Sequence, residues 1–350
     1  MKKSLKLIAV AASLTLITGV AVAPSAQAAK IKLCLALDTG GVDDRSFNQG
    51  AWEGAKSSSG FADAEYLAAA SSADFAPNIK KFVDKGCDLI VGVGFAISAE
   101  IVKSAKANPK IKYAVVDDAG EDCDANFNCK PVANVKGLTF QTDEAAFMAG
   151  YLAAGVSKTG KVATYGGAPY PTVTIFMDGY ARGVDYYNKQ KGKSVKVLGW
   201  DPANPKSGTF VGNFSDQTKA LTISKGFEQQ GADVILPVGG NLGAPYAAES
   251  EKSKKSLTIW VDSDGFGLLT AGKTILLTTV VKEIGASIKS VAKDVANKKF
   301  NGSKYVGTLK NKGVSIAPYH DQSSRVPGAL KLEVRKIRDA IIAGTLKVSA

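Results

Sequence analysis

Short apolar runs alternate with helix-like segments along almost the whole chain, and this alternation constrains the fold most. The strand candidates are KIKLCLAL, AEYLAAA, CDLIVGVG, KYAVVDD, NVKGLTF, KVATYGG, KVLGW, DVILPVGG, LTIWVDSD and ILLTTVV. The helix candidates between and after them are 47–59, 75–85, 96–107, 143–156, 176–191, 216–230, 243–254, 281–297 and 327–343. Nearly continuous apolar strands that alternate with helices are typical of a parallel sheet covered on both faces. The sequence therefore predicts an α/β fold.

The length of the chain predicts two such units. Its 350 residues exceed the ~250–300 residues that a single hydrophobic core usually covers. The strand–helix series runs once from KIKLCLAL to NVKGLTF and again from KVATYGG to LTIWVDSD. We expect two doubly wound lobes joined by hinge strands, with a cleft between them. Lobe I would comprise 29–140 plus 280–306, and lobe II 141–279 plus 307–350.

The first 28 residues have the pattern of a signal peptide. A basic start (MKKSLK) is followed by the apolar run 7–22 and the small-residue cleavage site AQA at 26–28. The apolar run is shorter than the ~20 residues of a comfortable membrane span, so an uncleaved anchor helix is the weaker alternative. A lipoprotein would carry a cysteine after the small-residue site 16–19, where this chain has Val20. We expect export to the periplasm or the outer cell surface, without a lipid anchor.

Four cysteines fit an exported protein. Cys123 and Cys129 flank a short polar loop, DANFN, that a disulfide could close. Cys34 lies in the first strand, and Cys87 stands at the head of CDLIVGVG, which we expect to be the adjacent strand. Of the three possible pairings, we favour Cys34–Cys87 with Cys123–Cys129. The alternative for Cys34 and Cys87 is that both are reduced and act as small buried hydrophobic residues.

The positive charge of the chain does not indicate a nucleic-acid partner. The formal net charge is +12, spread along the sequence and densest in 250–313 and in the last helix. No Arg-rich run and no interleaved aromatic residues of the kind that bind single strands occur. A solvated cationic surface facing an anionic cell envelope is the preferred interpretation.

Motifs for catalysis, metals and cofactors are missing from the sequence. His320 is the one histidine, and no GxSxG, CxxC or metal-spaced His/Cys cluster occurs. The pairs Asp43-Asp44 and Asp117-Asp118 resemble catalytic carboxylates, but adjacent side chains normally point apart. One member of each pair is expected to cap a helix or to pin a loop. We therefore predict neither an enzyme nor a bound metal or cofactor.

Polar and aromatic residues at strand ends form the candidate site. In an open α/β sheet, ligands bind beyond the carboxyl ends of the strands. The residues at such positions are Asp38, Phe47, Asn48, Asp117, Asp262 and Lys282. Taken singly, Phe47 could be a core contact, Asp262 a helix cap and Lys282 a solvated lysine. Together they suit a neutral ligand with a diol and a flat heterocycle, because a carboxylate and an ammonium can hold vicinal hydroxyls.

The motifs DDRSFNQGAWEGA, VVDD, FMDGYARGVDYY, VGGNLGAP, WVDSD and LLTTVVK resemble the signature series of the basic membrane protein family. Members of this family are solute receptors of ABC importers, and the best understood bind purine nucleosides. The resemblance covers essentially the whole mature chain in the right order. It implies the two-lobed fold of type I periplasmic binding proteins, which ribose receptors share.

The resemblance also implies roles for the candidate residues. Phe47 should stack on the base, and Asn48 and Asp117 should hydrogen-bond its polar edge. Asp262 and Lys282 should hold the ribose at the other end of the ligand.

Further positions follow from the same resemblance. Gly239-Gly240 should let the backbone approach the sugar, and Met177 with Asp178 should line the lobe II side of the pocket. Nucleoside-binding members tend to have a second aromatic residue in the strand before the Gly-Gly loop, where this chain has Leu236 and Pro237. Loss of one stacking ring would cost about 0.5–1.5 kcal/mol.

Together with the resemblance, these observations predict the substrate-binding protein of an ABC importer. The predicted ligand is a nucleoside, with a purine nucleoside preferred. Its expected partners are the permease and the ATPase subunit of the importer, and we expect a monomer. The alternatives are a receptor of the same fold for a sugar and a secreted sensor without a transport role. A nucleoside hydrolase would need an aspartate cluster such as DxDxxxDD, which the chain lacks.

Overall fold

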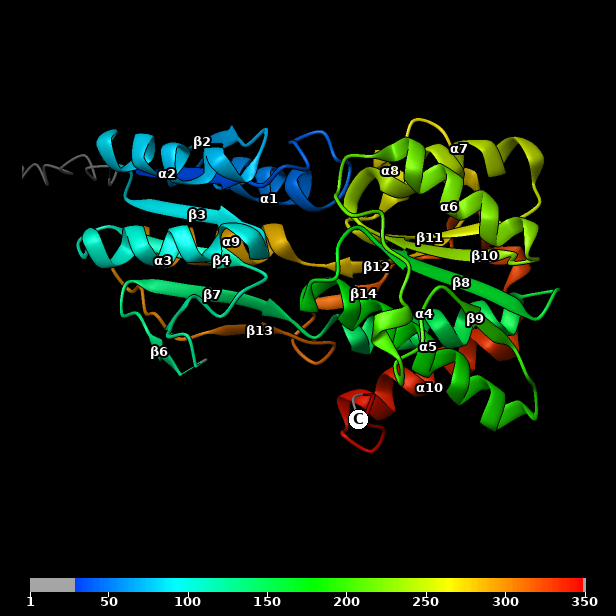
Figure 1. Cartoon of the computed structure of the whole chain (residues 1–350). Helices are drawn as coiled ribbons and strands as arrows, with labels where there is room; N and C mark the ends of the chain where they lie inside the picture. Colours follow the sequence, from blue (N-terminus) through cyan, green and yellow to red (C-terminus); the bar gives the residue numbers. More distant parts are fainter. Residues whose placement is uncertain (1–28, 127, 349–350) are drawn as a thin grey trace, which may run out of the picture.

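The computed structural model describes residues 29–126 and 128–348. The predicted signal peptide, residues 1–28, lies outside this part of the chain. Figure 1 shows two lobes side by side, each an open sheet with helices on both of its faces. The predicted α/β class with two doubly wound lobes is confirmed. No helix in the described residues is both long enough and apolar enough to cross a membrane.

Lobe I is built on a six-stranded sheet in which every pair of strands is parallel. Its strands, in order across the sheet, are β13 (Tyr305–Gly307), β7 (Val135–Phe140), β4 (Lys112–Val116), β3 (Leu89–Val93), β1 (Ile31–Leu37) and β2 (Ala62–Ala68). Its helices are α1 (Phe47–Lys56), α2 (Phe75–Asp84), α3 (Ser98–Ala107) and α9 (Ile284–Ala296). Helices α1 and α9 cover one face of the sheet, and α2 and α3 cover the other.

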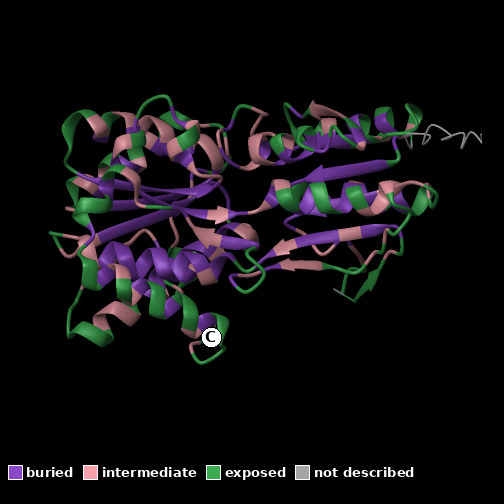
Figure 2. Ribbon diagram, turned by 180° about the vertical axis from the view of Figure 1, so that it is seen from behind, coloured by how far each residue is buried: buried purple, intermediate pink, exposed green. Residues whose placement is uncertain are grey.

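Strand β1 shows why the central strands of this lobe are mostly apolar. Leu33 and Leu35 point into the core under α1 and α9, whereas Cys34 and Ala36 point into the core under α2 and α3. Successive side chains of a strand face opposite sides of the sheet, so helices on both sides require apolar residues on both faces of β1 from Leu33 to Leu37. Figure 2 shows the inner strands of the sheets as mostly buried and the outer helix faces as exposed.

Lobe II repeats this architecture with one departure. Its strands, in order, are β14 (Val314–Ile316), β12 (Leu276–Lys282), β11 (Leu257–Asp262), β10 (Val234–Val238), β8 (Lys161–Gly166) and β9 (Lys196–Leu198). Its helices are α4 (Thr142–Val156), α5 (Pro171–Lys191), α6 (Gln217–Gln229), α7 (Ala244–Ser253), α8 (Gly265–Leu268) and α10 (Gly328–Ile342). The edge strand β14 runs antiparallel to β12. The three-residue strands β13 and β14 were not among the predicted strands.

The chain passes between the lobes three times. It enters lobe II between β7 and α4, returns to lobe I between β12 and α9, and enters lobe II again between β13 and β14. Lys282 is the last residue of β12 and therefore stands at the second passage. This position brings a lobe II strand end against the carboxyl end of β4 in lobe I.

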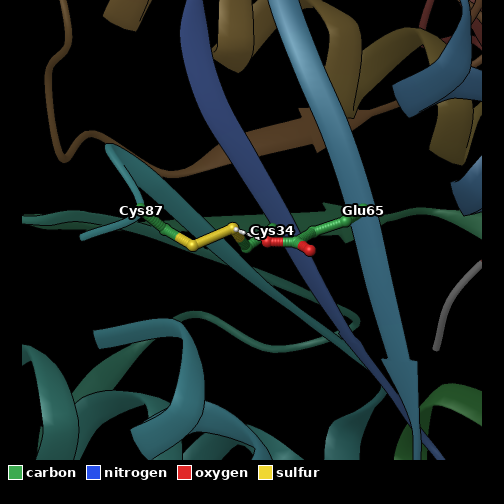
Figure 3. Close-up of side chains that lie close together, drawn as sticks. All are labelled: Cys34, Glu65 and Cys87. Carbon is green, nitrogen blue, oxygen red and sulfur yellow. Dashed lines mark hydrogen bonds between the residues drawn. A yellow bond between two sulfur atoms is a disulfide. The ribbon is translucent and has the colours of Figure 1, made fainter. Parts of the chain in front are cut away.

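Two disulfides form the favoured pairings, Cys34–Cys87 and Cys123–Cys129. Cys123 and Cys129 close a hairpin of β5 (Glu121–Cys123) and β6 (Cys129–Pro131). Figure 3 shows Glu65 on the strand next to Cys34, with its side chain directed toward the disulfide. Its Oε1 lies 3.5 Å from the Cys34 sulfur. Because the sulfurs of Cys34 and Cys87 are bonded to each other, they are not available as metal ligands.

Helices α4 and α5 pack backbone against backbone because glycines stand at their contact. A Cβ at Gly183 of α5 would lie 2.0 Å from the Phe147 carbonyl oxygen, and one at Gly150 of α4 would lie 2.0 Å from the Tyr180 carbonyl oxygen. Neither neighbour can yield without moving a helix. Helices α4 and α5 thus form one closely packed layer of lobe II, and the first turn of α5 extends from this layer to the cleft.

We expect Gly183→Ala to destabilise the fold by about 1–3 kcal/mol, the usual cost of overpacking. Gly226 offers a matched control, because it lies inside α6 and its Cβ would meet nothing within 4 Å. There alanine should stabilise by roughly 0.5–1 kcal/mol by restricting the unfolded chain. Urea denaturation of both variants measures the two effects, and equal effects would contradict the close packing.

Candidate functional site

A cavity lies between the lobes at the carboxyl ends of both sheets. Its walls come from residues that follow β1, β3 and β4 in lobe I, and from the ends of β10, β11 and β12 with the start of α5 in lobe II. The candidate residues that line it are Asp38, Phe47, Asn48, Asp117, Gly240, Asp262 and Lys282. The structure thus brings together residues that are far apart in the sequence.

Lys282 forms the charged centre of the cavity. Its Nζ donates to both carboxylate oxygens of Asp117, at 2.8 and 3.0 Å, and lies 3.5 Å from an oxygen of Asp262. All three side chains are buried. Burial acts to lower the pKa of Lys282, but the carboxylates of Asp117 and Asp262 outweigh it and raise the pKa above its usual value. We call these residues the charged triad.

The two carboxylates of the triad occupy corresponding places in the two lobes. Asp117 follows β4, the strand between β7 and β3, and Asp262 ends β11, the strand between β12 and β10. Both have left-handed backbone, with φ of 68° and 67°. Residues other than glycine rarely adopt this conformation, and it is concentrated at binding and active sites. The strand ends therefore hold both carboxylates in a fixed orientation.

Phe47 lies beside the charged triad, and its stacking on a base stays a prediction. The centre of its ring is 5.0 Å from the Lys282 Nζ, and the rings of Phe176 and Phe140 are 5.2 and 5.7 Å away. A cation is attracted to the face of an aromatic ring at such distances. These rings help to hold the buried ammonium in place, and the Phe47 ring still lines the cavity.

Asn48 belongs to a second polar group, which it forms with Asp38 and Asp44. Its side-chain nitrogen donates to Asp38 at 2.7 Å and to Asp44 at 3.1 Å. Its Oδ1 is buried and has no hydrogen-bond partner among the described residues. Asn48 thus contacts Asp38 and Asp44, whereas Asp117, which was expected to bind the same edge of the base, pairs with Lys282. The free Oδ1 can accept a hydrogen bond from a ligand N–H group.

Asp44 caps α1, as the sequence predicted for one member of its pair. Its carboxylate accepts the backbone N–H groups of Ser46, Asn48 and Gln49 at 2.8–3.0 Å. Burial nevertheless raises the pKa of Asp44 from its ordinary 3.8 to about 7, against these hydrogen bonds.

The raised pKa of Asp44 predicts a pH dependence of stability. Because the folded value exceeds the unfolded one, Asp44 contributes stability that is complete below about pH 4 and is lost as the pH rises through about 7. We expect the free energy of unfolding of wild type, minus that of Asp44→Asn, to decrease from pH 4.5 to pH 8. Urea denaturation at each pH measures it. If the difference in unfolding free energy instead grows with pH, the Asp44 carboxyl is ionised over the whole range and its pKa is not raised.

Met177 and Asp178 do not line the cavity, which corrects the sequence expectation. Met177 is fully buried in the lobe II core, and Asp178 accepts a hydrogen bond from the Trp200 indole at 2.9 Å. Helix α5 begins at Pro171, five residues before the predicted start at 176. The first turn and Phe176 therefore face the cavity, while the residues that follow Phe176 rotate away from it.

Strand β10 contributes no aromatic ring. Leu236 is fully buried in the core. From the end of β10 and the loop after it, Val238, Gly239 and Gly240 line the cavity. Aromatic residues that the sequence analysis missed supply further walls, namely Phe75, Phe95, Tyr170, Phe176 and Phe214. Position could have indicated two of them, because Phe95 and Tyr170 follow the carboxyl ends of β3 and β8.

Comparisons with known proteins identify the family and the fold. The family model described as ABC transporter substrate-binding protein PnrA-like matches residues 31–349. The nucleoside-binding protein BmpA of an ABC transporter in Lactococcus lactis is 29% identical over 341 residues, covering 91% of this chain and 89% of that protein. Basic membrane protein A of Borreliella burgdorferi is 30% identical over 288 residues, with 81% and 78% covered. An ABC transporter solute-binding protein from Aeropyrum pernix shares the fold, with a TM-score of 0.77, 23% identity, and 91% and 92% covered.

Proposed function

Because this chain belongs to the PnrA-like family of ABC transporter substrate-binding proteins, we propose that it binds a nucleoside between its lobes and that it prefers purine nucleosides. The motifs in the sequence predicted the same family. The observation that carries this proposal is the charged triad. Asp117 from lobe I, and Asp262 with Lys282 from lobe II, converge on one point of the cavity. Carboxylate acceptors beside an ammonium donor suit the vicinal hydroxyls of a ribose.

The rest of the cavity suits the base. The unpartnered Oδ1 of Asn48 and the carboxylate of Asp38 offer acceptors for ring N–H or amino groups. The lining is otherwise rich in aromatic rings, which bind flat heterocycles well. A free sugar would use the triad and leave these groups without partners.

The charge of the cavity favours a nucleoside over a nucleotide. The carboxyl groups of Asp38, Asp44, Asp117 and Asp262 line it, and Lys282 is the one cation among its lining residues. A phosphate would bring further negative charge into a buried acidic site, and such like-charge contacts cost several kcal/mol.

Binding would be coupled to transport through closure of the cleft. A ligand that contacts groups of both lobes stabilises the closed form, so its binding energy shifts the population between open and closed states. The permease of the importer, with its ATPase subunit, would then recognise the closed monomer outside the cytoplasm. Export through the predicted signal peptide is part of this proposal.

Calorimetry with inosine, guanosine and adenosine, alongside ribose, hypoxanthine and inosine monophosphate, tests the proposal. We expect at least one nucleoside to bind more tightly than ribose or the free base, and the monophosphate to bind at least about tenfold more weakly. Ribose that binds as tightly as any nucleoside would instead favour a sugar receptor. Release of free hypoxanthine from inosine would indicate an enzyme.

A further inference from the structure

Three aromatic rings form the outer wall of the cavity. Phe95 lies 5.4 Å from Tyr170, and Tyr170 lies 6.0 Å from Phe214, measured between ring centres. All three line the cavity. Phe95 is 36% exposed, whereas the charged triad is buried. The rings therefore stand where the cavity meets solvent, and the triad lies at its inner end.

The contact between Phe95 and Tyr170 joins the two lobes. Phe95 begins the short helix η2 (Phe95–Ile97) directly after β3 of lobe I, and Tyr170 precedes α5 of lobe II. The segments that connect the lobes lie elsewhere, after β7, β12 and β13. This ring contact can therefore form only when the lobes come together over the cavity.

Glycines provide space for these rings. A Cβ at Gly167 would lie 2.4 Å from two ring atoms of Phe214, and one at Gly239 would lie 3.3 Å from the same ring. Asn213 fixes the turn that carries Phe214, because its side-chain oxygen accepts the backbone N–H groups of Ser215 and Asp216 at 2.9 and 2.7 Å. Phe214 is thus held at the cavity by the surrounding backbone, and it in turn supports Tyr170.

We propose that Phe95, Tyr170 and Phe214 form an aromatic cap that sets how long the ligand stays bound. The inference rests on the proposed function, because it concerns release from the same cavity. The cap acts after the ligand has entered, since its contact across the lobes exists only in the closed form. Loss of the Phe95 ring therefore speeds dissociation and leaves association nearly unchanged.

Stopped-flow binding of the best nucleoside from the calorimetry series tests the cap. The dissociation rate of Phe95→Ala should rise about threefold to tenfold, the range expected for one aromatic contact. Tyr170→Ala should raise it similarly, and the double variant should add little to either single change. Leu332→Ala is the matched control, because Leu332 is also an exposed hydrophobic residue (52%) but lies on α10, outside the cavity. A dissociation rate of Phe95→Ala equal to that of wild type overturns the proposal.

A second readout needs no ligand. Spin labels on cysteines introduced at Lys103 of α3 and Lys189 of α5, both highly exposed, report the distance between the lobes. The four native cysteines are already paired in disulfides. Without ligand, Phe95→Ala should lower the share of short distances relative to wild type. If wild type binds no nucleoside, the proposed function fails, and this measurement alone decides the cap. In that case, the same distribution of distances between the labels in Phe95→Ala and in wild type would overturn the aromatic cap.

Discussion

Lys282→Met is expected to destabilise the protein by about 3–5 kcal/mol and to abolish ligand binding. The substitution keeps most of the side-chain volume but removes the cation that lies against Asp117 and Asp262. Both carboxylates are then buried without a counter-charge, and breaking a buried pair from one side usually costs this much. The rings of Phe47, Phe140 and Phe176 also lose their cation.

Urea denaturation and calorimetry measure the two effects. Lys310→Met is the control, because Lys310 is exposed in the segment between β13 and β14, and its stability change should stay within about 0.5 kcal/mol. Adding Asp117→Asn and Asp262→Asn to Lys282→Met should restore much of the stability, since no buried charge remains, but should not restore binding. A single Lys282→Met variant as stable as wild type would show that the triad is solvated.

The sequence was enough to locate most of the site because the site follows from the fold. Parallel strands bring their carboxyl ends to one edge, so Asp38, Asp117 and Asp262 could be assigned to the cleft from position alone. Helix α1 begins at Phe47 as predicted, because the polar stretch before it contains the capping residue Asp44.

The groups that each residue contacts could not be deduced in the same way. Lys282 and Asp117 are 165 residues apart in sequence, and whether Lys282 pairs with Asp117 or with a ligand depends on how the lobes meet. The same holds for Phe95 and Tyr170. The error at Met177 and Asp178 was local, because Pro171 is well suited to the first position of a helix and could have marked the earlier start.

Asp262→Asn is expected to weaken nucleoside binding by about 10-fold to 150-fold while leaving the fold intact. A hydrogen bond to a charged group contributes roughly 1.5–3 kcal/mol, and asparagine keeps the shape but not the charge. Asparagine also tolerates the left-handed backbone at this position, where φ is 67°. Lys282 retains Asp117 as its partner, so thermal stability should change little.

A comparison of ligands shows whether Asp262 contacts the sugar hydroxyls. Wild type should bind the 2′,3′-dideoxynucleoside about as weakly as Asp262→Asn binds the parent nucleoside, because each change removes one side of the same contact. The Asp262→Asn variant should lose little further affinity when the ligand lacks the 2′ and 3′ hydroxyls. Such non-additive losses would show that Asp262 and these hydroxyls interact directly. Asp185→Asn, which removes an exposed carboxylate on α5, controls for the change in net charge. If the affinity lost through Asp262→Asn and the affinity lost through removal of the hydroxyls simply add, Asp262 contacts another part of the ligand, and the ribose assignment is wrong.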